Sequence, residues 1–151
     1  MNRRFVIMGL TAAGLAGCAA PSLPLGPDGL PLPTAYIIAP VALDPQLTAA
    51  AATHARDMSI QNRPWLFGAD GSSPPERARR VGFTGQLLGE VISESYESEL
   101  ATLSAWMNDE RTRRVILEPG ARLMGFSWFQ EAAGKLWWTL NMGTAPAFAG
   151  A

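Results

Sequence analysis

Two side chains of this sequence are candidates for acid–base chemistry, Glu90 and His54. Glu90 is the one acid in the apolar run Leu87–Ile92, where burial raises the pKa of a carboxyl group unless that group is hydrogen-bonded. His54 is the only histidine, which is too few for a divalent-metal site of the usual type, so we expect no metal and no cofactor. A Glu90–His54 acid–base pair is conceivable, yet no motif places a nucleophile beside it.

Each of these two residues also has a structural interpretation. Glu90 is either a cavity carboxylate that binds a ligand or a structural acid that accepts backbone N–H bonds and holds a loop. His54 shares one face of a predicted helix with Leu47, Ala51 and Met58, a pattern typical of a partly buried packing residue. The choice between these roles depends on the elements that carry the two side chains.

Local signals predict two helices in the first half of the domain. Asp44-Pro45 combines an N-cap residue with a proline in the first turn, and it predicts a helix that runs to about Ser59–Gln61. A capping box from Ser73 to Glu76 predicts a short helix that ends near Val81. The first of these helices carries His54.

The second half of the domain predicts a further helix and a hairpin. Ser95 is expected to cap the helix, and the segment from Trp106 to Leu117 predicts a helix end, a polar corner and a second short element. Residues 123–130 and 136–142 predict two strands joined by a hairpin, with helices on both faces because both strands are partly apolar on each face. The expected buried stripe of the helix is Leu100, Leu103, Trp106 and Met107.

Composition and the N-terminus limit the class of protein. Hydrophobic residues make up 48% of the 151 residues and charged residues 17%, enough apolar material for one folded domain. A basic start, an apolar run from Phe5 to Ala16 and small residues after it indicate a secretory signal over residues 1–17. Its removal leaves ten basic against thirteen acidic residues, a net charge of −3, so we expect no nucleic-acid partner.

The remaining chain divides into a tether, a domain and a tail. Five prolines lie within Ala19–Pro33, which disfavours both helix and sheet and predicts a tether over residues 18–33. We place the folded domain at residues 34–145 and a frayed tail at 146–151.

Five motifs in this order resemble the CAP superfamily, the SCP-like extracellular domains, and in particular their bacterial secreted members. The similarity spans roughly residues 43–143. It implies an α/β fold, a three-layer α-β-α sandwich with a small, mainly antiparallel sheet. The motifs are His54-Ala55-Arg56-Asp57-Met58, Asp70-Gly71-Ser72 with Arg77, Gly89-Glu90-Val91-Ile92, Trp106-Met107-Asn108 with Arg113 and Ile116-Leu117, and Trp137-Trp138-Thr139.

The departures from the family pattern concern its cavity, which is usually lined by two histidines and two acids. Matching the motifs places Leu66 and Thr112 where the family has those histidines. Asp109 stands where many members carry glutamate or serine, and Glu90 is retained. The candidate cavity residues implied by the resemblance are therefore Glu90, Asp109, Thr112 and Leu66, with His54 beside them.

The segment Leu15-Ala16-Gly17-Cys18 closely resembles the lipobox of bacterial lipoproteins. The resemblance implies that the Cys18 thiol receives a diacylglyceryl group and that Cys18 becomes the first residue of the mature chain. The alternative is an ordinary signal peptide that happens to end near a cysteine. Lipidation would anchor the protein in the cell envelope, and Ala19 is compatible with the outer membrane, facing the periplasm.

These observations predict a membrane-anchored envelope lipoprotein whose CAP-like domain is a non-catalytic binding or scaffold module. The expected partners are the membrane, through lipid on Cys18, and a lipid, glycan or envelope protein ligand. Two alternatives stay open: a hydrolase of peptides or glycans that uses Glu90 and His54, and a carrier of an apolar ligand lined by tryptophans. Two arginine clusters, at residues 77–80 and 111–114, either meet phosphate or pair with acids such as Glu76, Asp109 and Glu110.

Overall fold

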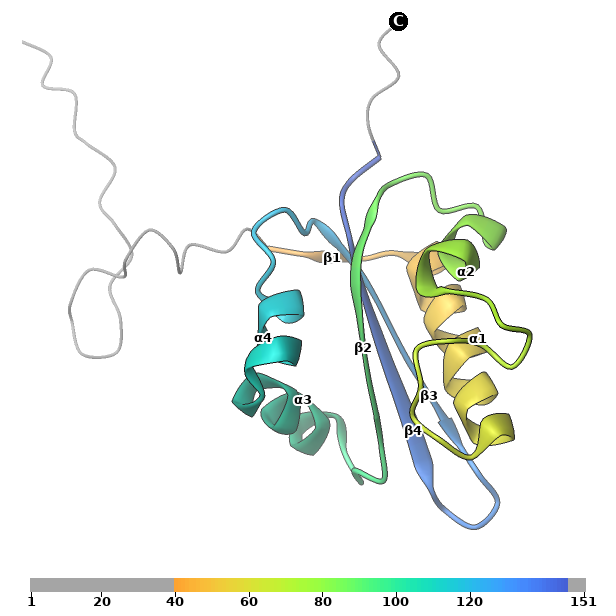
Figure 1. Ribbon diagram of the computed structural model, residues 1–151. Coiled ribbons are helices and arrows are strands. Elements are labelled where there is room, and N and C mark those ends of the chain that lie inside the picture. The colour runs from red at the N-terminus through yellow and green to blue at the C-terminus, as the bar shows by residue number, and fades with distance from the viewer. Residues whose placement is uncertain (1–39, 147–151) are drawn as a thin grey trace, which may run out of the picture. The chain divides into compact units, whose positions relative to one another are not determined.

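The computed structural model describes residues 40–146, so the predicted signal, Cys18, the tether and residues 147–151 lie outside the described residues. Figure 1 shows the arrangement of the helices and strands. The helices are α1 (Pro45–Gln61), α2 (Pro74–Arg80), α3 (Glu99–Asn108) and α4 (Glu110–Ile116). The strands are β1 (Ala42–Leu43), β2 (Leu87–Glu94), β3 (Leu123–Gln130) and β4 (Leu136–Gly143). Two pairs of helices separate the strands along the chain, in the order β1-α1-α2-β2-α3-α4-β3-β4.

The four strands form one mixed sheet in the order β1-β3-β4-β2. The β3–β4 hairpin is antiparallel, as predicted, and β2 pairs antiparallel with β4, while the short β1 pairs parallel with β3. Only the two hairpin strands are predictable from the sequence pattern. A short apolar run such as Leu87–Ile92 has no periodicity that separates strand from helix, and its pairing with β4 decides the matter.

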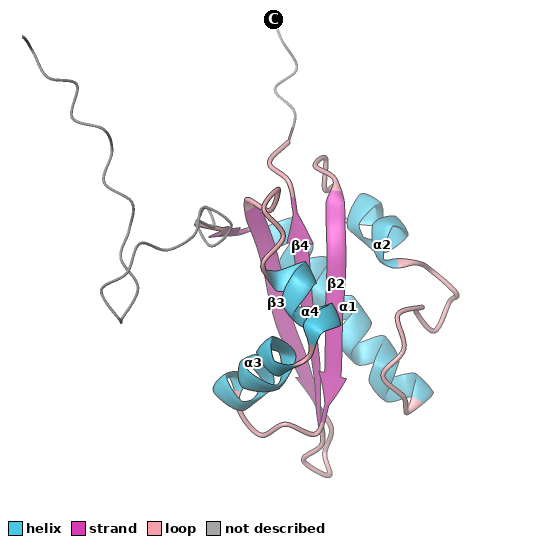
Figure 2. Ribbon diagram, turned by 60° about the vertical axis from the view of Figure 1, so that its left-hand side comes forward, coloured by secondary structure: helices cyan, strands magenta, loops and turns pink. Residues whose placement is uncertain are grey.

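Helices cover both faces of the sheet, which confirms the predicted α/β sandwich (Figures 1 and 2). On one face α1 packs against β3 and β4, and on the other α4 packs against β2. Glycines permit both approaches. A Cβ atom at Gly125 would lie 2.0 Å from the backbone carbonyl carbon of Leu47 in α1, and one at Gly89 would lie 2.6 Å from Cγ1 of Val115 in α4.

The two predicted caps of the first helices are confirmed. Asp44 Oδ1 accepts the N–H of Leu47 at 2.8 Å, and Pro45 occupies the first turn of α1. Ser73 and Glu76 form the capping box of α2, and the Glu76 carboxylate accepts the Ser73 N–H at 2.7 Å. These caps fix where α1 and α2 begin, and therefore where the connecting loop lies.

The prediction for α3 was wrong in its cap and in part of its buried face. Ser98, not Ser95, caps the helix, and Ser95 instead has a positive φ of 68° next to the end of β2. Leu100 is 79% exposed and Leu103 is also exposed, whereas Thr102 and Trp106 are buried. The buried face is the one that lies towards the sheet, and Thr102 and Trp106, four residues apart, share that face. The polar corner lies at Asp109, as predicted, and the second short element, which the sequence left open as helix or strand, is helix α4.

In residues 40–146 the structure contains no helix long and apolar enough to cross a membrane.

Candidate functional site

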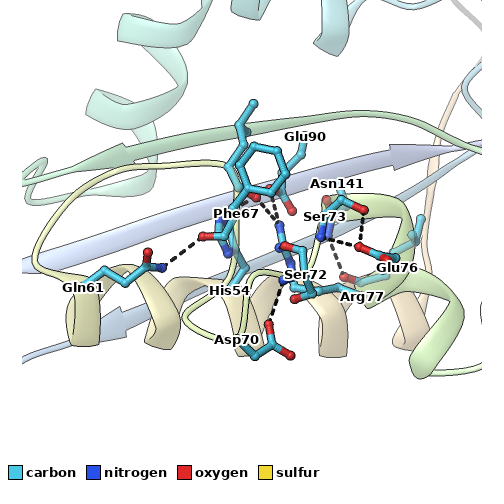
Figure 3. A network of polar contacts seen from close by, with 12 residues as sticks. His54, Gln61, Phe67, Asp70, Ser72, Ser73, Glu76, Arg77, Glu90 and Asn141 are labelled. Atoms are coloured by element: carbon cyan, nitrogen blue, oxygen red, sulfur yellow. Dashed lines mark hydrogen bonds and ion pairs between the residues drawn. The ribbon is translucent and has the colours of Figure 1, made fainter.

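Three buried polar side chains from three elements meet between α1 and the sheet (Figure 3). They are His54 of α1, Arg77 of α2 and Glu90 of β2. Glu90 Oε1 accepts a hydrogen bond from Arg77 Nη2 at 2.7 Å, and His54 Nε2 lies 3.5 Å from the same oxygen. The side chains of His54 and Glu90 are 0% and 1% exposed. His54 is thus fully buried, where the sequence predicted partial burial.

Arg77 joins this network to the loop between α1 and α2. Its Nη1 donates to the backbone oxygen of Ser72 at 2.6 Å, and its Nη2 also donates to that of Leu66 at 2.9 Å. The guanidinium therefore links both ends of the loop to the Glu90 carboxylate on β2. Such charge-assisted bonds are stronger than neutral ones, so the Arg77–Glu90 pair acts as a brace for the loop.

The loop has its own turn at Asp70-Gly71. Asp70 Oδ1 accepts the Ser72 N–H at 2.9 Å, and Gly71 has a φ of 81°, which glycine adopts readily. The loop also lies close to α1, since a Cβ atom at Gly68 would lie 2.8 Å from Asp57 Oδ2. The loop therefore has defined internal contacts and packs closely against α1.

Burial shifts the pKa of both titratable partners towards the neutral form. It raises the pKa of Glu90 to about 7, although the positive charge and hydrogen bond of Arg77 act in the opposite direction. Burial also lowers the pKa of His54 to about 4, and the positive charge of Arg77 lowers it further. Near neutral pH, His54 is accordingly uncharged and Glu90 is close to the midpoint of its titration.

A cleft of about 430 Å³ lies beside the network. Pro64 and Leu66 of the loop form one wall, α4 forms the other, and β2 lies between them. The structure thus brings Leu66, Glu90 and Thr112, three of the candidate cavity residues, to one cleft. The complete lining is Pro64, Leu66, Glu90, Val91, Ile92, Arg111, Thr112 and Val115.

The other candidate residues lie elsewhere or are engaged in local structure. Asp109 does not line the cleft; it caps α4 by accepting the Arg111 N–H at 2.8 Å, and its hydrogen bond with the Arg111 side chain lowers its pKa. Thr112 Oγ1 donates to the backbone oxygen of Trp106. His54 lies behind Glu90 and is not part of the cleft lining.

Arg77 was not predicted as the partner of Glu90, because in the sequence it belongs to a cluster of arginines that is typical of a surface. The signal was available in principle, since a carboxylate in an apolar run needs a cation or several donors. Other arginines of the clusters do pair with nearby surface acids, Arg80 with Asp70 and Arg114 with Glu110. Arg77 differs from them by being buried with its acid.

Within residues 40–146, no three His, Cys, Asp or Glu side chains are grouped so that they could hold a metal ion. The cleft itself is lined by one carboxylate-bearing residue, Glu90, whose carboxylate is buried against Arg77. The arrangement can hold a loop in place and offer a partly apolar surface. It does not present a nucleophile with an adjacent base.

A three-layer α/β sandwich with a braced loop beside a cleft defines a domain of the SCP-like class. The chain belongs to the CAP family, the Cysteine-rich secretory protein family, whose family model matches residues 34–142. No match was found among curated proteins.

Two solved structures share the fold. An outer surface protein from Borrelia burgdorferi superposes with a TM-score of 0.65 at 13% identity, covering 71% of this chain and 79% of that one. An extracellular protein containing an SCP domain from Bacillus anthracis also gives a TM-score of 0.65, at 23% identity. That match covers 72% of this chain and 35% of the other, so this chain corresponds to about a third of that protein's length.

Proposed function

We propose that this protein is a lipid-anchored component of the bacterial cell envelope whose CAP domain binds a ligand without catalysing a reaction. The lipobox-like segment that ends at Cys18 supports the anchor, and the surface and extracellular proteins that share the fold support the location. The ligand site is the cleft between Leu66 and Thr112.

Burial of Glu90 is the observation that carries the non-catalytic role. A general acid or nucleophile must come within hydrogen-bond reach of the substrate, or within one water molecule of it. The Glu90 side chain is 1% exposed and its carboxylate is bonded to Arg77, while His54 is completely covered. These groups stabilise the loop, and the cleft surface is formed by apolar side chains together with Thr112 and Arg111.

The cleft suits binding in size and in surface. Its volume of about 430 Å³ lies within the roughly 300–1,000 Å³ of small-molecule sites. Leu66 and Val115 offer apolar surface from opposite walls, and Thr112 and Arg111 add polar groups on the α4 wall. A ligand in the cleft contacts a loop, a strand edge and a helix at once, which supports a defined orientation.

The binding role is tested with two neighbouring loop variants of the full-length protein. Leu66→Glu places a charge in the cleft wall, whereas Phe67→Glu does so beside the cleft at nearly the same exposure, 45% against 43%. The probes are purified peptidoglycan, extracted envelope lipids and a random peptide pool, each measured by retention on immobilised protein. Loss of retention in Leu66→Glu alone supports the proposal, and equal behaviour of both variants contradicts it.

The hydrolase alternative is tested with the same probes as substrates. Glu90→Gln and His54→Gln keep side-chain size while removing acid–base capacity. We expect no turnover by the wild type, and turnover that both folded variants lose would overturn the non-catalytic role. The anchor is tested separately by incorporation of labelled fatty acid, which Cys18→Ser should abolish.

A second candidate function, carriage of an apolar ligand, is favoured by a separate cavity of about 260 Å³. It lies between the α3–α4 layer and the sheet, with Trp106 and Phe126 among its apolar lining residues. Extraction of the purified protein with organic solvent tests this role. Recovery of a stoichiometric lipid would support it, and its absence would exclude a tightly held apolar cargo.

A further inference from the structure

The strand that lines the cleft, β2, is an edge strand. Among the strands of residues 40–146, the sheet order ends with β2, which pairs with β4 alone (Figure 2). Unpaired N–H and C=O groups on such an edge are available for pairing with another chain. Which residues of β2 present these groups outward follows from the register.

One hydrogen bond fixes the pattern along the strand. Ser95 N–H donates to Leu136 O at 2.8 Å, directly beyond the last β2–β4 pair, so Ser95 and Leu136 form a hydrogen-bonded pair. In an antiparallel ladder, hydrogen-bonded pairs alternate with non-bonded pairs. Ser93 and Val91 therefore direct their backbone groups to β4. Glu94, Ile92 and Glu90 direct theirs away from the sheet.

The outward-directed N–H and C=O groups of Glu90 and Ile92 face the cleft. Both residues line it, whereas Glu94 does not. Glu90 is partly exposed as a residue although its side chain is 1% exposed, so the accessible part of Glu90 is its main chain. In the described part of the chain, no backbone hydrogen bond from another loop or helix ends on Glu90 or Ile92.

We propose that the cleft binds an extended peptide segment of a partner protein, which adds to the sheet as a strand alongside β2. This inference rests on the proposed binding function and names its ligand class. The exposed N–H and C=O groups of Glu90 and Ile92 recur every second residue, roughly 7 Å apart, and an extended peptide matches that spacing. An acyl chain has no hydrogen-bonding groups with which to pair them.

The two walls supply the side-chain selectivity of such a peptide. Successive side chains of an added strand point to opposite faces of the sheet. In Figure 1, β2 runs between α4 and the connection from α1 to α2, so one set faces Pro64 and Leu66 while the other faces Thr112 and Val115. The first set meets apolar surface, whereas the second meets Val115 beside the polar side chains of Thr112 and Arg111. We expect bound peptides to carry apolar residues at the positions that face the loop and polar residues at the alternate positions.

Amide hydrogen exchange tests the geometry in the free protein. The amides of Val91 and Ser93 should exchange slowly, because they bond to β4, while those of Glu90 and Ile92 should exchange rapidly. Uniform protection along β2 would overturn the inference, because it would mean that the outer edge is already paired.

The ligand class is tested with phage-displayed random dodecapeptides selected on the full-length protein in detergent. Adding a selected peptide should slow exchange of the Glu90 and Ile92 amides. Two versions of the peptide are compared, one N-methylated at odd-numbered residues and one at even-numbered residues. Only one of these sets of amides faces β2, so one version should bind about tenfold more weakly and the other should bind as before. Equal affinity of the two N-methylated peptides would overturn strand addition.

Two proline variants give a matched control in the protein. Ile92→Pro and Glu94→Pro each remove one outward N–H and no backbone bond to β4, a position where an edge strand tolerates proline. Ile92→Pro also removes a side chain that packs against the cluster around Trp137, and Glu94→Pro removes the ion pair with Lys135, so folding of both variants is checked first. Only Ile92→Pro should weaken peptide binding, by about tenfold. Equal loss in both variants, with circular dichroism unchanged, would contradict the proposal. If Ile92→Pro does not fold, the N-methylated peptides decide the matter with the wild-type protein.

Failure of this inference is distinguishable from failure of the binding function. If no peptide is selected while Leu66→Glu still abolishes retention of lipid or peptidoglycan, the peptide proposal is overturned and the binding function stands. If Leu66→Glu changes retention of none of the probes, both are overturned.

Discussion

The buried pair of His54 and Glu90 predicts an unusual dependence of the unfolding free energy on pH. In the folded protein the pKa of Glu90 is raised to about 7 and that of His54 is lowered to about 4, from ordinary values of 4.5 and 6.5. Between pH 4.5 and 6.5 the folded pair therefore carries its proton on Glu90, and the unfolded chain carries one on His54. Folded and unfolded states bind equal numbers of protons, so the pair adds no slope.

Two substitutions should reveal the opposing slopes that cancel in the wild type. The pKa of Glu90 is raised in the folded state, so its stabilising contribution is complete below pH 4.5 and is lost as the pH rises through 7. The pKa of His54 is depressed, so its contribution is complete above pH 6.5 and is lost as the pH falls towards 4. His54→Gln should thus make stability fall with rising pH, and Glu90→Gln should make it rise. Each slope reaches at most about 1.4 kcal/mol per pH unit. The unfolding free energy changes by about 3 kcal/mol in all over the pH range between the unfolded and folded pKa values of each residue.

Urea denaturation followed by tryptophan fluorescence, at several pH values from 4.5 to 6.5, measures these slopes. Surface carboxylates such as Asp70 and Asp109, whose pKa values are lowered by hydrogen bonds, contribute equally to all three proteins. The informative quantity is the difference between each variant and the wild type. Opposite signs for the two variants are the expected result. Variants whose curves stay parallel to the wild type would refute the assigned pKa shifts.

Three further predictions concern the brace, the packing of α1 and the absence of a metal. Arg77→Met should lower the free energy of unfolding by about 1–3 kcal/mol, because Glu90 and the backbone oxygens of Leu66 and Ser72 would lose their shared hydrogen-bond donor. Arg79→Met at the exposed surface should change it little, and equal effects in urea denaturation would argue against the brace. Gly125→Ala should destabilise the protein by more than about 2 kcal/mol, since its Cβ would lie 2.0 Å from a backbone atom of α1. Gly120→Ala should be tolerated, because the nearest atoms to its Cβ would lie at 3.6 Å. Equal urea midpoints for the two variants would contradict the close approach of α1. In thermal melts, zinc and chelator should leave the midpoint unchanged, and a large zinc-specific increase would contradict the no-metal prediction.

Features determined by neighbouring residues were readable from the sequence. Asp44-Pro45 and the Ser73–Glu76 box fix helix starts through bonds that span three residues, so no distant contact is needed to predict them. The turn between β3 and β4 is equally local, with Glu131 N–H bonded to Lys135 O and Gly134 at positive φ. The order of such local motifs also identified the family, which the match to residues 34–142 confirms.

The roles of the candidate residues were decided by tertiary structure. Nothing near Glu90 in sequence indicates that Arg77, thirteen residues earlier, shares its buried site. The face of α3 that is buried depends on where the sheet lies, and so Leu100 was wrongly assigned to the core. The free edge of β2 follows from its pairing with β4 alone. Short-range hydrogen bonds specify caps and turns, whereas burial, ion pairing and strand edges depend on which distant segments meet, and these decide what the cleft can bind.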